Sequence, residues 1–174
     1  MSGPLAFRHA DPGDLDAISA LIERAYRGDD AKVGWTHEAD LLDGTRLAPG
    51  EIEAVLVDPA CRFLLAHDPE LVACALLRRE GDAAYFGMFA VDPRRQSGGI
   101  GSRVLEAAED AARRLWSARA LRMTVISLRE ELIAFYERRG YRLTGARERF
   151  PFEQTIPRRT DFDFVELSKE LRAP

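Results

Sequence analysis

The spacing of apolar residues along the first part of the chain predicts a strand followed by a helix. Leu5–His9 is short and carries apolar residues at alternate positions, as a strand does. Asp11 and Pro12 then suit the cap and the first position of a helix. After them an apolar side chain recurs every three or four residues, which is the period of an amphipathic helix. These positions are Leu15, Ile18, Leu21, Ile22 and Ala25.

Residues 28–60 give weaker periodic signals, and three strand-like segments follow them. Gly28–Asp30 is typical of a loop, whereas Thr36–Leu42 and Gly50–Leu56 each have the pattern of a short helix. Each of the next apolar segments is short and bounded by turn residues, which predicts strands. The first two are expected to form a hairpin, and Asp92-Pro93 ends the third because proline has no N–H for a strand ladder. The three segments are Cys61–Ala66, Leu71–Arg78 and Ala83–Val91.

The second half of the chain is predicted to hold two helices and three strands. A helical period marks Gly101–Ala118 and Glu130–Arg139, and Gly140 ends the latter. Gly145–Thr160 is polar, contains proline and is rich in arginine, so we expect a long loop or irregular arm there. The strands expected around it are Leu121–Ile126, Tyr141–Thr144 and Asp161–Leu167.

This order of elements predicts an α/β (α+β) fold with one mixed, mostly antiparallel central sheet of about seven strands, flanked by helices. A chain of 174 residues has the size of one ordinary domain, so we expect a single domain over residues 1–174. The composition, 46% hydrophobic and 31% charged, is that of a globular protein with a real core.

Charge and cysteine content narrow the environment and the partners. The formal net charge of −4 offers no electrostatic footprint for nucleic acid. The longest unbroken apolar run, Leu71–Leu77, is too short to cross a bilayer, and the first residues lack the pattern of a signal peptide. Cys61 and Cys74 lie in apolar runs, which predicts buried, reduced thiols. We therefore expect a cytoplasmic protein that binds neither membrane nor nucleic acid. With two cysteines and three scattered histidines, no metal site is expected.

The segment with the clearest chemical signal runs from Phe86 to Leu105. It reads as an apolar strand, a proline stop, a basic and glycine-rich turn, and an amphipathic helix. Glycines at positions 98, 99 and 101 let backbone N–H groups approach a ligand closely, and those groups lie at a helix N-terminus, which favours an anion. Arg94 and Arg95 add positive charge at the mouth. The segment therefore predicts a phosphate or pyrophosphate site, with a turn that only caps the helix as the alternative.

Two other phosphate-binding loops fit this turn poorly. A P-loop requires Gly-Lys-Ser/Thr at the helix start, and Gly101 is followed by serine and arginine instead. A dinucleotide fingerprint would require a third glycine where Val104 stands.

Gln96-Ser-Gly-Gly99-Ile-Gly101 is similar to the Gln/Arg-x-x-Gly-x-Gly/Ala signature of the GNAT superfamily of N-acetyltransferases. The resemblance extends to the strand and proline before it and to the helix after it. A second block, Arg129-Glu-Glu-Leu-Ile-Ala-Phe-Tyr136-Glu-Arg-Arg-Gly140-Tyr141, resembles the family's later helix with its tyrosine and Gly-aromatic pair. The order of elements agrees over nearly the whole chain.

The resemblance implies a GNAT-like acyl-CoA N-acyltransferase fold, with acetyl-CoA as cosubstrate and no metal. In such enzymes the strand before the glycine turn pairs with the pantetheine arm as an added β-strand would. The amides of the turn hold the pyrophosphate, and basic residues surround it. The residues thereby expected to bind the cofactor are Phe89, Ala90, Val91, Arg94, Arg95, Gln96, Ser97, Gly98, Gly99, Ile100, Gly101, Ser102 and Arg129.

Tyr136 occupies the position from which a tyrosine often protonates the departing CoA thiolate in this family. The alternative is a core aromatic, because Leu132, Phe135 and Tyr136 share one helix face. Arg129 stands where many relatives have an asparagine that contacts the CoA arm. It either contacts a CoA phosphate or is a solvated arginine at the helix start.

No general base is apparent from the sequence. Some relatives use a glutamate on the strand before the glycine turn, but Ala83–Val91 contains no carboxylate. A water chain or a side chain from the first third of the chain would then serve. His37 is the first of these to consider, because its ordinary pKa suits proton transfer near neutral pH. The other candidates are Glu23, Asp29, Asp30, Glu38, Asp40 and Asp43.

The acceptor is expected to be a small-molecule amine or a peptide amine. Acceptor pockets in this family are built from the regions matching Arg27–Pro59 and Gly145–Thr160. Acidic residues at positions 29, 30, 38 and 40 would suit a cationic amine, and a solvated charged face explains them equally well. Many relatives dimerise, so a homodimer is an option. The competing functions are a CoA-binding regulatory module without catalysis and a nucleotide-binding protein unrelated to CoA.

Overall fold

The computed structural model describes residues 3–27, 40–95 and 98–173. Among them, seven strands form one sheet in the order β1-β3-β4-β5-β6-β9-β7, and β2 and β8 form a separate pair. The predicted mixed, mostly antiparallel sheet is therefore confirmed, with β5–β6 as its parallel pair. The strands are β1 Ala6–His9, β2 Leu42–Asp43, β3 Cys61–His67, β4 Leu71–Glu80, β5 Ala83–Val91, β6 Ala120–Ile126, β7 Arg142–Glu148, β8 Ile156–Pro157 and β9 Phe164–Glu170. The α-helices are α1 Leu15–Tyr26, α2 Glu51–Val57, α3 Ile100–Trp116 and α4 Glu130–Glu137, with short 3-10 turns at Pro12–Asp14, Pro93–Arg95 and Phe152–Gln154.

The start of the first helix follows the predicted capping pattern. The Asp11 carboxylate accepts a hydrogen bond from Gly13 N at 2.8 Å, and Asp14 accepts one from Asp11 N at 2.9 Å. This reciprocal pair satisfies two N–H groups that the helix itself leaves without partners. The first turn is a 3-10 turn, and α1 proper begins at Leu15.

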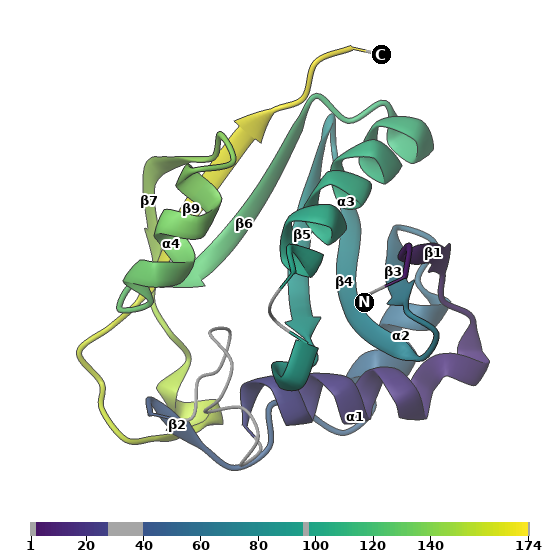
Figure 1. The fold of residues 1–174 in the computed structure, drawn as a ribbon. Coiled ribbons are helices and arrows are strands. Elements are labelled where there is room, and N and C mark those ends of the chain that lie inside the picture. Colours follow the sequence, from purple (N-terminus) through teal and green to yellow (C-terminus); the bar gives the residue numbers. More distant parts are fainter. Residues whose placement is uncertain (1–2, 28–39, 96–97, 174) are drawn as a thin grey trace.

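The helices cover both faces of the sheet (Figure 1). Helices α1 and α2 bury Ile18, Leu21, Ile22 and Ile52 against β3 and one side of β4. Helices α3 and α4 pack on the opposite face, where the second apolar cluster includes alternate residues of β4, β5 and β6. This two-sided burial explains why β4 reads as a continuous apolar run from Leu71 to Leu77.

The central sheet opens between β5 and β6. Ala83–Tyr85 of β5 pair in parallel with Ala120–Arg122 of β6, and beyond Tyr85 the two strands diverge (Figure 1). The pairing of β4 with β5 shifts by one residue, because Cys74 pairs with Ala90 and Leu76 with Gly87, so the extra residue lies on β5 and bends it. Met88 lies in this bend with a φ of 43°, a left-handed conformation that is rare outside glycine. The sequence indicated a regular strand here, so the bulge is a finding of the structure.

The arm predicted at Gly145–Thr160 is more ordered than expected. Strand β7 continues through Glu148, and β8 pairs with β2. Leu42, expected at the end of a helix, belongs to β2, and residues 36–39 of that expected helix lie outside the described residues. The loop expected at 28–30 also lies outside them. Strands β2 and β8 have two residues each and pair across more than 100 positions of the chain. The local sequence pattern does not predict such a distant partner.

Both cysteines are buried and free, as predicted. Burial raises the pKa of the Cys74 thiol to about 12, so that thiol is held in its inert, protonated form. Within the described ranges, no helix is long and apolar enough to cross a membrane.

Candidate active site

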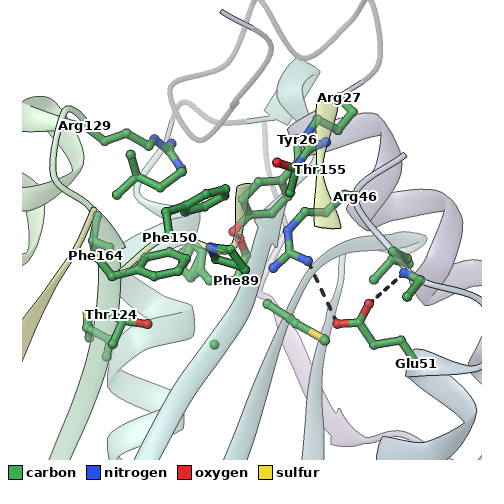
Figure 2. A pocket seen from close by; sticks show the side chains of 18 of the residues that line it. Tyr26, Arg27, Arg46, Glu51, Phe89, Thr124, Arg129, Phe150, Thr155 and Phe164 are labelled. Carbon is green, nitrogen blue, oxygen red and sulfur yellow. Dashed lines mark hydrogen bonds and ion pairs between the residues drawn. The ribbon is translucent and has the colours of Figure 1, made fainter. Parts of the chain in front are cut away.

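A cavity of about 580 Å³ lies where β5 and β6 diverge. Its walls come from the end of α1, the loop before α2, both diverging strands, the start of α4 and the segment around Phe150. Figure 2 shows Arg129 and Phe150 on one side of this pocket, with Tyr26 and Arg46 across from them. The split sheet therefore brings together residues that are far apart in the sequence.

Tyr136 lies on α4 and lines this cavity. Its side chain is buried, and its ring packs edge-on against Phe86, Phe135 and Tyr141 with centroid distances of 6.4, 5.3 and 5.9 Å. Burial raises the pKa of its hydroxyl above the ordinary tyrosine value, and the nearby Tyr26 adds to this effect. The hydroxyl therefore keeps its proton at neutral pH.

The floor of the split is closed by a hydrogen bond between the Tyr85 and Thr124 hydroxyls, at 3.1 Å. Tyr85 leans across its own strand, so that a Cβ at Gly87 would approach its ring to 2.6 Å. Glycine at position 87 is therefore required for this tyrosine orientation. Tyr85 and Thr124 are not among the residues predicted from the sequence. The one local signal for them is Gly87, an isolated glycine within a strand, which indicates a bulge or a close approach.

Tyr26, at the end of α1, fixes the bend of β5. Its hydroxyl donates a hydrogen bond to the backbone carbonyl of Phe89, one of the residues predicted to meet the CoA arm. Ala90 and Val91, the next two predicted residues, are buried in the strand beside it. The role of Tyr26 had no local signal, because its partner lies 63 positions away.

The glycine turn has the backbone shape that an anion site needs. Gly98 and Gly99 have φ values of 88° and 75°, and a Cβ at either position would meet nothing within 4 Å. Gly99 precedes α3 and has no side chain to cap the helix start, and the first turn of α3 contains no acidic residue. The first N–H groups of a helix have no partner within the helix itself. Gln96 and Ser97 lie outside the described residues.

Ser102 contacts Arg139, which is not among the cofactor-binding residues predicted from the sequence. The Arg139 guanidinium donates to the Ser102 hydroxyl, at 2.9 Å from Nε, and lies 3.6 Å from the centre of the Phe135 ring. These side chains line a second cavity of about 470 Å³, which also includes Gly99 and Gly101. The end of α4 therefore delivers positive charge to the start of α3. The helical period places Arg139 only at the end of the predicted helix, and its contact with Ser102 across 37 positions has no local signal.

Arg94 and Arg95 differ in their surroundings. The Arg95 guanidinium lies 2.6 Å from the Asp68 carboxylate, in the turn between β3 and β4. The Arg94 side chain is two-thirds exposed and pairs with Asp92, which also accepts a bond from Arg24 at 3.1 Å. Burial opposes ionisation of Asp92, but the Arg94 hydrogen bonds and the Arg24 charge outweigh it, so the pKa of Asp92 is lowered.

Arg129 precedes α4 and lines the central cavity together with Tyr136. The cavity at the start of α3 is bordered by other residues in the part of the chain that the structure describes. Arg129 is thus placed nearer to the split between β5 and β6 than to the glycine turn.

Three of the candidate bases can be placed. Glu23 accepts hydrogen bonds from the backbone N atoms of Arg46 and Leu47, at 2.8 and 2.6 Å, which gives it a structural role. Asp43 pairs with Arg158 at 2.7 Å, and Asp40 is exposed. None of these three lines the central cavity as the described residues define it. The other candidates, Asp29, Asp30, His37 and Glu38, lie outside those residues.

Residues 17–141 match the model of the acetyltransferase (GNAT) family. The chain belongs to this family. As a GNAT protein it is an acyl-CoA-dependent acetyltransferase, and the glycine turn and the tyrosine helix both lie within the matched segment. No curated protein sequence matches the chain.

Solved structures share the GNAT fold at low sequence identity. The ribosomal-protein-S18-alanine N-acetyltransferase from Escherichia coli is 16% identical, with a TM-score of 0.73 and coverage of 98% of this chain and 96% of that one. An N-acetyltransferase from Staphylococcus aureus Mu50 is 17% identical, with a TM-score of 0.73, and the match covers 97% of this chain and 99% of that one. Spermidine N-acetyltransferase from Vibrio cholerae, solved with CoA and spermine, is 17% identical, with a TM-score of 0.69, and the match covers 96% of this chain and 95% of that one. These likenesses extend the family's fold to nearly the whole chain.

Proposed function

We propose that this GNAT protein transfers the acetyl group of acetyl-CoA to a primary amine. The observation that carries the proposal is the cavity between the diverging strands β5 and β6, into which α4 brings Tyr136. Such a cavity lets a thioester enter along β5 from one side and an amine from the other.

The residues around α3 fit the phosphates of CoA. The start of α3 follows a glycine that has no side chain to cap it, with open space beside Gly98 and Gly99, and Ser102 in its first turn accepts a hydrogen bond from Arg139. Backbone donors and a helix N-terminus favour a pyrophosphate. We assign the pyrophosphate to the turn from Gln96 to Gly101 with Ser102, and the pantetheine arm to Phe89, Ala90 and Val91. Arg94 is the more exposed of the two neighbouring arginines, and we assign it to the phosphates at the entrance of the site. Arg95 forms an ion pair with Asp68, and we assign it to the same phosphates from that fixed position.

When bound, acetyl-CoA supplies the acetyl group as a thioester. The neutral amine nitrogen forms a bond to the acetyl carbon, the C–S bond breaks, and the amine proton is released to solvent. Tyr136 holds its proton at Oη, gives it to the departing thiolate and regains a proton from solvent, which has taken up the proton lost by the amine.

The names of two structural neighbours support an amine acceptor. One acts on spermidine, and the other on the alanine of ribosomal protein S18. A small-molecule amine and a peptide amine are therefore both within the reach of this fold.

Thermal unfolding with acetyl-CoA, CoA, NADH and ATP, each in large excess, tests the cofactor assignment. A ligand at 100 times its Kd stabilises the folded state by about 2.7 kcal/mol, which raises the Tm of a chain this size by a few degrees. We expect this shift with the two CoA species alone. A larger shift with a nucleotide, or none with CoA, would overturn the assignment. Release of free CoA thiol in the presence of a broad amine panel then tests the transfer itself.

A further inference from the structure

The central cavity passes through the sheet, because residues from both faces of the sheet line it. Phe86, Met123 and Tyr136 line it and belong to the apolar cluster under α3 and α4. Tyr85 and Thr124 also line it, and on their strands Tyr85 precedes Phe86 and Thr124 follows Met123. Since successive residues of a strand point to opposite faces, Tyr85 and Thr124 lie on the face away from Tyr136. The split therefore has the proposed general acid on one side and a pair of hydroxyl groups on the other.

The sheet around this hydroxyl pair is solvated. On this face α1 and α2 cover β3 and one side of β4. The side chains next to the pair on β4, β6 and β9 are charged and between 23% and 42% exposed; they are Arg78, Glu80, Arg122 and Glu166. Among the described residues, this side of the split is therefore open to a polar molecule that approaches from solvent, away from the side of α3 and α4.

Several neighbours fix the orientation of the Tyr85 side chain. The guanidinium carbons of Arg78 and Arg122 lie 4.7 and 5.4 Å from the centre of its ring. Glu80 pairs with both arginines at 3.0 Å and so holds them in place. Gly87 leaves the space that the ring needs, since a Cβ there would approach it to 2.6 Å. The hydroxyl is thus positioned on rigid strands before any ligand binds, as precise recognition requires.

The two hydroxyls keep the capacity to bind a further group. Each hydroxyl has one O–H donor and lone pairs that accept hydrogen bonds. The bond between them, at 3.1 Å, uses one O–H and one lone pair. In the described part of the chain neither oxygen has a second hydrogen bond. Acceptor lone pairs therefore remain on both oxygens at the wall of the pocket, where Figure 2 shows Thr124.

Tyr85 also lies within electrostatic reach of Tyr136. Burial is the main cause that raises the pKa of the Tyr136 hydroxyl, the nearby Tyr26 adds to it, and Tyr85 makes a smaller contribution in the same direction. The two tyrosines therefore act on one small space from opposite faces of the sheet.

We infer that the Tyr85 and Thr124 hydroxyls bind the acceptor amine and hold its nitrogen against the acetyl carbon, on the face opposite Tyr136; this rests on the proposed acetyl transfer. Their oxygens accept an N–H of the neutral amine, which leaves the nitrogen lone pair free for the thioester. As the C–N bond forms, the nitrogen becomes positive and its N–H bonds become more polar. The hydrogen bonds to the pair then strengthen in the transition state. Both hydroxyls keep their protons, and the amine proton leaves to solvent.

Loss of either hydroxyl tests the inference. Tyr85→Phe and Thr124→Val should each lower kcat about tenfold, as expected for one hydrogen bond, with the KM for the amine little changed because the bond strengthens in the transition state. The KM for acetyl-CoA and the Tm shift with acetyl-CoA should stay at the parent values. Release of CoA thiol with benzylamine, spermidine and alanylalanine measures the rates, and the best of these amines for the parent is used with every variant.

Two further variants separate a substrate contact from structural support. Thr124→Ser keeps the hydroxyl and should retain most of the parent kcat. Thr144→Val removes another strand hydroxyl, which bonds to Glu166 at 3.0 Å outside the cavity, and should leave kcat unchanged. If Thr124→Ser loses as much kcat as Thr124→Val, or if the KM for acetyl-CoA rises in step with the loss, the pair only ties the two strands together and the inference is overturned.

The two proposals fail in different ways. Turnover by the parent with full kcat in Tyr85→Phe and Thr124→Val leaves acetyl transfer standing and removes the hydroxyl pair from the acceptor site. A shift in Tm with acetyl-CoA but no turnover of any of the three amines by the parent counts against acetyl transfer itself, and the inference falls with it.

Discussion

The Tyr136 hydroxyl is the single group on which the proposed proton transfer depends. Tyr136→Phe should lower kcat by about 100-fold or more, because a general acid contributes that much, and should leave the Tm shift with acetyl-CoA nearly intact. Steady-state kinetics with a saturating amine would measure the loss. An unchanged kcat would return Tyr136 to the role of a core aromatic.

Tyr141 provides the matched control, because it is also buried and lies against the Tyr136 ring. Its hydroxyl donates to Glu109 at 2.9 Å, and Lys169 holds the same carboxylate at 2.9 Å. Tyr141→Phe should therefore lower the free energy of unfolding by about 1 to 3 kcal/mol without changing kcat. A similar loss of kcat in both variants would show that the effect comes from packing.

At the scale of elements, the start of α3 carries the cofactor assignment. Gly99→Glu places a side chain and a negative charge at the proposed pyrophosphate seat and should abolish the Tm shift with CoA. Gly81→Glu is the control, since Gly81 also has a positive φ of 63° with open space around it, in the turn between β4 and β5. Both variants strain the backbone by about 1 to 2 kcal/mol. Undiminished CoA binding by Gly99→Glu would remove the pyrophosphate from this turn.

The start of α1 predicts a pH effect. The Arg8 guanidinium, 2.6 Å from Asp14, lowers the pKa of that carboxyl from 3.8 to about 2. A depressed folded-state pKa means that the ion pair stabilises the fold above about pH 3.8 and loses this effect as the pH falls towards 2. Asp14→Asn keeps an oxygen to cap Asp11 but loses the charge. Its Tm should be below that of the parent at pH 7 and converge with it near pH 2; a constant difference would assign the effect to capping.

At the scale of the whole molecule, the sequence predicts the features that are formed by residues close together in the chain. The strand, turn and helix around Gly98 and Gly99 follow from composition and period, and Tyr136 follows from a resemblance carried by one continuous block. The pocket walls are different. The Tyr85–Thr124 bond, the Tyr26 contact with Phe89 and the Arg139 contact with Ser102 each join separate elements. No local period encodes such pairs, so the direction of the split and the set of residues that line it emerge only from the folded chain.

The pairing of β2 with β8 is the clearest case of such a long-range effect. It joins the loop before α2 to the segment after β7, both of which supply pocket walls. Leu42 anchors it, 1% exposed and packed with Ile126, Phe150 and Phe162. The Arg158–Asp43 ion pair adds little, because both side chains are about half exposed. Apolar packing therefore holds this side of the pocket in place.

Leu42→Ala should loosen that side. Deletion of a buried leucine side chain lowers the free energy of unfolding by about 2 to 5 kcal/mol. Because Phe150 lines the cavity proposed to receive the amine, the KM for the amine should rise while the KM for acetyl-CoA stays close to that of the parent. Ile18→Ala, which removes a fully buried side chain from the core cluster under α1 and α2, should lose comparable stability with both KM values unchanged. If the two variants shift the amine KM equally, the effect is one of general stability, and the β2–β8 pair has no specific part in shaping the pocket.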